Sequence, residues 1–288
     1  MPETALPIMS RERVRRFEQV IGEAHRSSMR RSMAVDDNPQ GIAFFEDGGW
    51  IGTLAANAPV ATWMHEVYGV EFGEADEARL DRLLAFYKEH GATPRLRVVP
   101  DGFEARFADA MQARGLRHFG FHTVLYGVAE RREQGFAEGV AVHRCETTEE
   151  ARHAMRVMLE GFIGHAGPAE QVERVRRTWH EEPGFRTYLG LLDGEPAGAA
   201  MLAVEEDEAL GRVGYLMMGA VKGDCRKRGV QAALIRARLN DAAELGCGLV
   251  LGGSDFESSS RQNQERAGLR IAYTAALWAP GPSGDREG

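Results

Sequence analysis

Two stretches of the chain share one order of predicted elements, and this internal repeat limits the possible folds more than any other feature. Residues 83–126 and 234–278 both run helix, glycine, strand, loop, helix, Gly-Leu-Arg and strand. The offset between them is roughly 150 residues, about the size of one domain. The repeat predicts two copies of one α/β unit, residues 1–135 and 136–288. A chance likeness of two helix–strand–helix segments is the alternative.

The other elements follow from hydrophobic periodicity and from turn residues. Helices are predicted over residues 11–33, 74–91, 102–115, 147–162, 169–182, 230–246 and 258–268. Strands are predicted over residues 61–72, 93–100, 116–129, 211–221, 247–256 and 269–278, with hairpins over 41–56 and 185–206. The charged, glycine-containing stretch 129–139 is predicted to link the two copies.

The composition is that of a soluble globular protein. Of its 288 residues 43% are hydrophobic and 27% are charged, so a sizeable core can form. No apolar run approaches the ~20 residues that span a bilayer, and the first residues do not resemble a signal peptide. Cys145, Cys225 and Cys247 lie far apart without metal-ligand spacing. We therefore expect a cytoplasmic chain with free thiols, no metal site and no membrane contact.

The net charge of −8 argues against nucleic acid as a partner and weakly favours a cationic or amine substrate. Against this acidic background, residues 225–239 read CRKRGVQAALIRARL, so three basic residues and a glycine directly precede a helix. A helix N-terminus has backbone N–H groups without partners and the positive end of the helix dipole. A glycine there lets an anion approach closely. The pattern predicts a phosphate site, although it is neither a Walker P-loop nor a dinucleotide fingerprint.

The loop also carries a family resemblance. Arg226-x-x-Gly229-x-Gln231, preceded by the apolar strand LMMGAV, resembles the pyrophosphate loop of the GNAT superfamily of acyl-CoA N-acyltransferases. Downstream, Asn263 and the Gly268-Leu269 turn resemble the second half of that family's motif. The resemblance covers residues 140–278, and the N-terminal half joins it only through the repeat. It implies two GNAT-like domains of the α/β (α+β) class, each a mixed, mostly antiparallel sheet flanked by helices.

The resemblance implies an acyl-CoA site, with acetyl-CoA as the expected donor. Its cofactor-binding residues would be Gly219, Ala220, Val221, Arg226, Lys227, Arg228, Gly229, Val230, Gln231, Ala232, Asn263 and Arg266. Pantetheine would bind beside the strand that ends in Val221, whose backbone N–H groups would polarise the thioester carbonyl. Gly219 is a candidate for a β-bulge in that strand.

The sequence departs from the family pattern in two places. Gln231 stands where Gly or Ala is usual, so its side chain would either crowd the cofactor or bond a phosphate oxygen. The Tyr that often precedes the final turn as general acid is missing, and Tyr273 lies later, on the next strand. Candidates for the general base are Asp255 and Glu257, with Glu205, Glu206 and His165 as further options.

The first copy differs at the equivalent loop, where it carries acids. Glu71, Glu74, Asp76 and Glu77 stand where the second copy has Arg and Lys. Because acids repel a pyrophosphate, we predict that the first copy does not bind acyl-CoA and instead has a structural role or walls the substrate site.

Together these features predict an N-acetyltransferase that acts on a primary amine of a small molecule or a peptide, with a homodimer as a possible assembly. A CoA-binding or regulatory protein that keeps the fold without turnover is the main alternative, and an unrelated α/β protein is the third.

Overall fold

The computed structural model describes residues 6–33, 38, 40–57, 64–71, 76–100, 105–132, 135–165 and 184–281. The chain divides into two compact units. We call Met9–Val124 with Ala272–Gly288 the N unit, and Met1–Ile8 with Leu125–Ile271 the C unit. The predicted helix over residues 169–182 and the Glu74 position lie outside the described residues.

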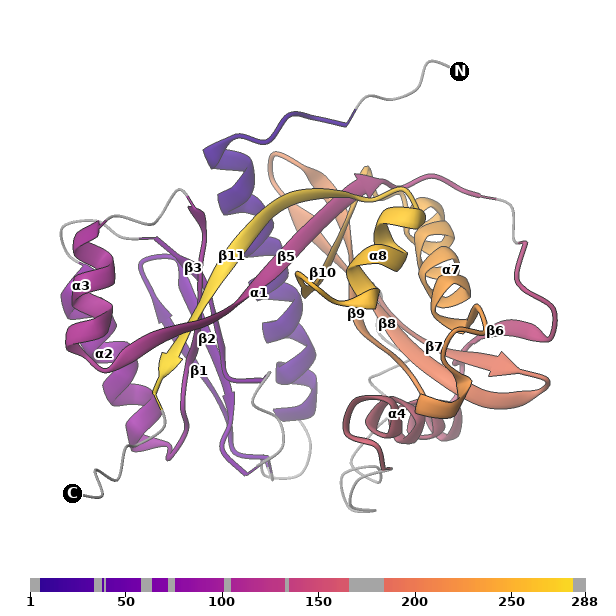
Figure 1. Cartoon of the computed structure of the whole chain (residues 1–288), viewed down its shortest axis with the longest axis horizontal. Helices are drawn as coiled ribbons and strands as arrows, with labels where there is room; N and C mark the ends of the chain where they lie inside the picture. Colours follow the sequence, from indigo (N-terminus) through magenta and orange to yellow (C-terminus); the bar gives the residue numbers. More distant parts are fainter. Residues whose placement is uncertain are drawn as a thin grey trace. The chain divides into compact units, whose positions relative to one another are not determined.

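The N unit is a sheet with helices against it (Figure 1). Its elements are α1 (Arg11–Met33), β1 (Ile42–Asp47), β2 (Trp50–Ala55), β3 (Glu66–Val70), α2 (Asp76–Glu89), β4 (Arg95–Val98), α3 (Ala105–Ala113), the first part of β5 (Leu116–Val128) and most of β11 (Arg270–Pro280). The apolar faces of α2 and α3 form the core with the sheet, through Leu80, Leu83 and Phe107.

The C unit repeats this plan. Its elements are β6 (Val140–Arg144), α4 (Thr148–Ile163), β7 (Phe185–Leu192), β8 (Glu195–Asp207), β9 (Gly211–Val221), the 3-10 turn η3 (Gly223–Cys225), α7 (Val230–Glu244), β10 (Leu249–Asp255) and α8 (Ser259–Arg266). α4 and α7 cover opposite faces of its sheet (Figure 1). Thr147 caps α4 in a capping box with Glu150, as the sequence predicts.

The strand pairing confirms the predicted α/β class with mixed, mostly antiparallel strands in each unit, although all eleven strands belong to one hydrogen-bonded sheet. β1-β2-β3-α2-β4-α3-β5 and β7-β8-β9-α7-β10-α8-β11 follow the same order. Each copy contains a parallel pair at the equivalent place, β3 with β4 and β9 with β10. The hairpins β1–β2 and β7–β8 are antiparallel and turn where the sequence predicts. β6, which pairs antiparallel with β7, is an additional strand that the sequence analysis missed.

The last strand of the chain is placed differently from what a division at residue 135 implies. β11 pairs antiparallel with β4, with Ala276 opposite Val98, so from Ala272 onward it belongs to the N unit. The last residues of β5, from Leu125, belong to the C unit, where β5 neighbours β10. The N unit therefore contains a strand, β11, from the second copy of the sequence. The C unit contains the end of a strand, β5, from the first copy. None of the described helices is long and apolar enough to cross a bilayer.

Candidate functional site

The parallel pair of the C unit comes apart before its strands end. β9 and β10 are in register only from Val213 opposite Leu249 to Leu216 opposite Gly252. β9 continues to Val221, and β10 continues to Asp255. Backbone N–H and C=O groups on the facing edges therefore do not pair with each other beyond this point. Such edges accept an extended ligand that carries amide groups, in the manner of an added strand.

A β-bulge lies in β9 where the two strands diverge. Ala199 pairs with Ala220 and Met201 pairs with Met217, so β9 contains one more residue than β8 over this interval. Met218 has the left-handed φ of 49°, which a side chain rarely adopts. The bulge is where the sequence analysis places it, but Met218, not Gly219, takes the unusual conformation. It re-aims the backbone of the following residues.

The helix that follows starts with an open N-terminus. Gly229 is the N-cap of α7 with a φ of 91°, and among the described residues no side chain caps the first N–H groups. A Cβ at residue 229 would lie 2.9 Å from Ala137 Cβ, so both the backbone conformation and the space favour glycine there. The N–H groups of Val230, Gln231 and Ala232 and the helix dipole together make a seat for an anion.

The three basic residues before this helix differ in what they contact. Arg226 donates to the carbonyl oxygens of Val221 (3.3 Å) and Gly161 (3.1 Å), so it ties the loop to β9 and α4. Arg228 makes only a loose pair with Asp193 at 3.6 Å, and both side chains are more than half exposed. Lys227 forms no ion pair with any residue that the structure describes. Of these three basic residues, Lys227 and Arg228 are thus the two whose charges are available to a ligand.

The two cofactor-binding residues predicted on α8 contact each other, and the catalytic candidates lie on other parts of the chain. Arg266 donates to Asn263 Oδ1 at 2.9 Å, which orients that side chain. Asp255 ends β10, and Asp255 and Glu257 are both exposed. Tyr273, which is 7% exposed, belongs to the N unit and donates to Glu18 Oε1 at 2.6 Å.

Cys225 adjoins the loop without the features of a nucleophile. Burial, followed by the hydrogen bond to Asp224, raises the pKa of the Cys225 thiol. A thiol is a far weaker nucleophile than a thiolate, so the side chain is not activated.

The C unit contains a buried polar group that the sequence does not predict. Arg238, in the middle of α7, is only 2% exposed. Ser254 Oγ and Gln264 Oε1 are buried without a hydrogen-bond partner among the described residues. A periodic pattern places an arginine on a helix but does not tell whether its head reaches water.

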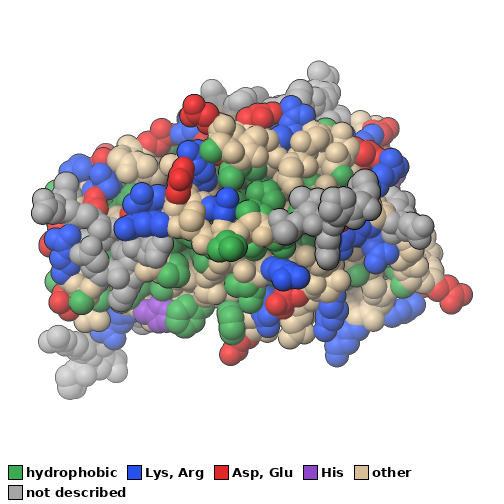
Figure 2. Space-filling view, turned by 90° about the horizontal axis from the view of Figure 1, so that it is seen from above, with side chains coloured by type: hydrophobic (Ala, Val, Ile, Leu, Met, Phe, Trp, Pro, Cys, Tyr) green, Lys and Arg blue, Asp and Glu red, His purple; other side chains and the backbone are tan. Residues whose placement is uncertain are grey.

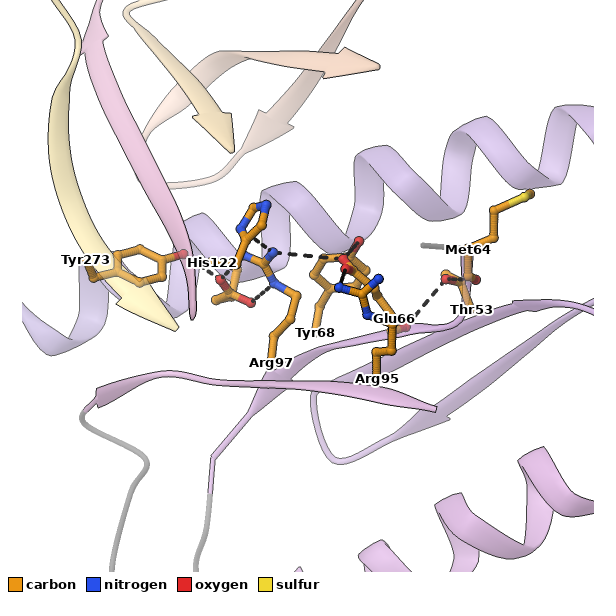
Figure 3. A network of polar contacts seen from close by, with 9 residues as sticks. Thr53, Met64, Glu66, Tyr68, Arg95, Arg97, His122 and Tyr273 are labelled. Atoms are coloured by element: carbon orange, nitrogen blue, oxygen red, sulfur yellow. Dashed lines mark hydrogen bonds and ion pairs between the residues drawn. The ribbon is translucent and has the colours of Figure 1, made fainter. Parts of the chain in front are cut away.

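The N unit has a buried polar network of its own (Figure 3). Arg97, on β4, donates to Glu18 Oε1 at 3.0 Å, and both side chains are 1% exposed. The same guanidinium contacts His122 Nδ1 at 2.8 Å. Burial and then the Arg97 charge lower the pKa of His25 to about 3, and the same causes lower that of His122. The network joins α1, β4, β5 and β11.

The equivalent loop of the N unit differs from that of the C unit. β3 also has a bulge, at Gly69 with a φ of 70°, but the pairing with β4 continues to Val70 opposite Val98. The acids of the loop have arginine partners, since Glu71 pairs with Arg15 and Asp76 pairs with Arg79. These residues line a cavity of about 520 Å³, whose charged lining is balanced. Its charged residues are Arg11, Arg15, Arg79, Glu18, Glu71 and Asp76.

Charged side chains of both signs are interspersed on the face that Figure 2 presents, and the basic ones do not merge into one surface there.

Comparison with known proteins assigns the fold. Residues 147–259 match the acetyltransferase (GNAT) family. A GCN5-related N-acetyltransferase from Kribbella flavida superposes with a TM-score of 0.64 at 17% identity, covering 93% of this chain and 97% of that one. A tandem GNAT protein from the clavulanic acid biosynthesis pathway gives 0.56 at 15% identity, with 93% and 89% covered. No curated protein matches the sequence significantly.

A third solved structure has the same fold. A GCN5-related N-acetyltransferase from Sphaerobacter thermophilus superposes with a TM-score of 0.56 at 13% identity, covering 88% of this chain and 84% of that one. At such identities the superpositions show the fold alone, and the match to the acetyltransferase (GNAT) family is confined to residues 147–259.

Proposed function

We propose that the C unit, whose residues 147–259 match the acetyltransferase (GNAT) family, moves an acyl group from acyl-CoA to a primary amine of a small molecule or peptide. One observation carries the proposal. The diverging ends of β9 and β10 lie next to a helix that starts with a glycine and uncapped N–H groups. An extended arm with amide groups fits between such strands, and a pyrophosphate fits such a helix start. Acetyl-CoA is the simplest donor with both parts.

The residues of the loop fit this ligand in different ways. The N–H groups of residues 230–232 and the side chains of Lys227 and Arg228 would hold the phosphates. Arg226 keeps the loop in place through its bonds to Val221 and Gly161. Asn263 and Arg266, joined to each other on α8, would contact the far side of the cofactor.

The chemistry needs a polarised carbonyl and a neutral amine. The backbone N–H groups after the bulge, from Gly219 to Val221, would donate to the thioester oxygen as it gains negative charge. Asp255 and Glu257 are the proposed groups to accept a proton from the incoming ammonium, directly or through water. We assign Tyr273 a structural role instead, because its hydroxyl donates to Glu18. Transfer would be direct, since Cys225 is not activated.

A CoA-binding protein without turnover is the second candidate. The observation that favours it is the exposure of Asp255 and Glu257, which have no described partner to orient them. An oriented general base normally gains its position from such a partner.

Two measurements test these functions in order. Free CoA should raise the melting temperature of the wild type, because a ligand that binds only the folded state stabilises it. The Lys227→Ala, Arg228→Ala double variant should lose most of that shift, and Lys88→Ala, an exposed lysine of the N unit, should keep it. CoA release from acetyl-CoA with a panel of primary amines then separates an enzyme from a binding protein. A full shift in the double variant would overturn the loop assignment.

The N unit is proposed not to bind acyl-CoA. The observations in support are the pairing of β3 with β4 to their ends and the acids beside the cavity. Calorimetric titration with acetyl-CoA should give one site per chain. A second site that persists in the Lys227→Ala, Arg228→Ala variant would contradict the proposal.

A further inference from the structure

Arg238 has hydrogen-bonding capacity that the protein does not use. Its Nε donates to Leu234 O at 3.0 Å, and its Nη1 donates to Met201 O at 3.2 Å and Met217 O at 3.1 Å. These bonds use three of the five N–H groups of a guanidinium. Both N–H groups of Nη2 lack a partner among the described residues.

The bonds that Arg238 does make explain only part of its presence. Met201 and Met217 flank the β-bulge, where the ladder between β8 and β9 is interrupted, and their carbonyl oxygens need donors. A neutral amide could satisfy such carbonyls. The positive charge is not required for this task.

The charge of Arg238 is also uncompensated. Burial lowers its pKa to about 10, so the side chain stays protonated at neutral pH. Asp241, one turn further along α7, is already paired with Arg186 at 2.6 Å and with the Tyr188 hydroxyl at 2.6 Å. No carboxylate among the described residues forms an ion pair with Arg238. A buried cation without a counter-charge is costly, and an anionic ligand would remove that cost.

Gln231 brings a second donor to the same point. A Cβ built on Gly219 would lie 3.3 Å from Arg238 Nη2 and 3.3 Å from Gln231 Nε2. The two nitrogens therefore converge beside the residue that follows the bulge. The Gln231 side chain forms no hydrogen bond with the residues that the structure describes. This is the position where the family pattern has Gly or Ala, and its side chain reaches toward β9.

The site lies where β9 and β10 diverge. Leu216 packs in the core beneath α7, and Gly252, its partner in the parallel register, faces the same side. Two residues on, Ser254 faces that side too, and its Oγ has no described partner. The gap between β9 and β10 is thus lined by polar groups on the side that α7 covers.

The anion that fits beside Gly219 is not the pyrophosphate. Residue 238 is eight positions beyond the first residue of α7, or about 12 Å along the helix axis. The loop before α7 already offers its own cations and N–H groups to phosphates. An anion beside Gly219 would instead sit at the reacting end of the site. A pair of converging N–H donors, one of them charged, matches the two oxygens of a carboxylate.

We propose that Arg238 and Gln231 form a recognition site for a ligand carboxylate where β9 and β10 diverge, so that the C unit prefers a carboxylate-bearing acyl donor or amine acceptor. The inference rests on the proposed acyltransferase function. Both sources present the same chemistry to the site, and the experiment distinguishes them.

The donor arm compares the binding of succinyl-CoA with that of acetyl-CoA by calorimetry. If the carboxylate is on the donor, succinyl-CoA binds the wild type about tenfold or more tightly, the usual scale for a charge-assisted contact. Arg238→Met and Gln231→Ala should reduce that ratio toward one. Gly219→Ala should do the same, because its Cβ would fill the site. Gly223→Ala, in the 3-10 turn that follows β9, is the matched control, since a Cβ there meets nothing within 4 Å.

The acceptor arm uses acetyl-CoA with amino acids and with the corresponding amino acid amides. If the carboxylate is on the acceptor, kcat/KM is higher for the acids, and the three variants lose this preference while Gly223→Ala keeps it. The absence of a carboxylate preference in both arms overturns the inference. A preference that the three variants retain overturns it as well.

Two further outcomes need their own measurements: an Arg238→Met variant that does not fold, and a wild type that does not bind free CoA. Arg238→Met removes donors from the bulge carbonyls, so circular dichroism must verify its fold; should it not fold, Gly219→Ala and Gln231→Ala decide. If free CoA does not bind the wild type, the proposed function fails, and sodium glutarate alone is then titrated. If glutarate stabilises the wild type but not Gln231→Ala, the carboxylate site is supported. If glutarate does not stabilise the wild type, the carboxylate site is overturned.

Discussion

Tyr273 donates a hydrogen bond of 2.6 Å to Glu18, a residue 255 positions away in the sequence. Glu18 also accepts from Arg97, so the carboxylate is held between the last strand of the chain and β4. Both partners of the Tyr273 bond are buried, at 7% and 1% exposure. The bond therefore ties β11 into the interior of the N unit.

Removing this hydroxyl should cost stability and leave catalysis alone. Tyr273→Phe is expected to lower the free energy of unfolding by about 1–3 kcal/mol, because a buried carboxylate loses a donor. Urea denaturation measures the loss, and kcat per folded molecule should change little. Tyr126→Phe, which loses a bond to the backbone oxygen of Pro7, is the control for a neutral acceptor and should lose less. A hundredfold drop in kcat with unchanged stability would restore Tyr273 as an acid.

The N unit should become less stable in acid through His25. The folded pKa is about 3, whereas an unfolded histidine has a pKa of about 6.5. Between these values the unfolded chain binds a proton that the folded chain does not, so stability is full above pH 6.5 and falls toward pH 3. The slope is at most about 1.4 kcal/mol per pH unit.

Comparing variants isolates this contribution. His25→Gln should flatten the difference in unfolding free energy between pH 7 and pH 5, measured by urea denaturation. The exposed His153→Gln should leave it as in the wild type. An identical pH dependence in the wild type and His25→Gln would refute the assignment.

The three basic residues of the loop should have separable effects. Lys227→Ala and Arg228→Ala are each expected to weaken CoA binding severalfold at low salt, with a smaller effect at high salt, because exposed charges are screened. Arg226→Ala should lower the melting temperature without ligand, because it leaves the carbonyls of Val221 and Gly161 without that donor. Calorimetry at two salt concentrations and thermal melts measure the two effects. If the effect on CoA binding depended equally on salt in all three variants, Lys227 and Arg228 would not differ from Arg226 in their roles.

Gly229 should be required for CoA binding at the N-terminus of α7. Gly229→Ala forces a left-handed conformation on alanine, at about 1–2 kcal/mol, and places a Cβ against Ala137. Both stability and CoA affinity should fall. Gly246→Ala, at the other end of α7, has a similar φ of 77° without a close contact, so it should reduce stability but leave CoA affinity unchanged. Loss of CoA affinity in both variants would indicate a general effect of helix stability.

Much of the fold was predictable because its signals are local. The helical spacing of Phe17 and Ile21, the turn at Asp193-Gly194 and the Thr147 cap each act within a few residues. The repeat then gave the shared order of elements. β6 was missed because Val140–Arg144 is short and only one of its residues is buried.

The polar interactions were less predictable, because partners distant in the chain decide them. The arginines of α1 look like a solvated face in the sequence, yet Arg15 pairs with Glu71 across the N unit. The acids of the first copy likewise look unopposed until Arg15 and Arg79 are placed beside them. Arg238 has the spacing of a core position and the chemistry of a surface one, so only its neighbours reveal its role.

The position of β11 has a consequence for how the protein is made. The ribosome releases β11 only after the residues of the C unit, although β11 pairs within the N unit, which also contains α1. That unit must wait, with the edge of β4 open, while the intervening residues are translated at roughly 5–20 per second. A gene cut at codon 135 would yield two fragments that each lack a closing strand. Exposed edges of this kind attract other chains, so such fragments should aggregate singly and recover solubility when they are produced together.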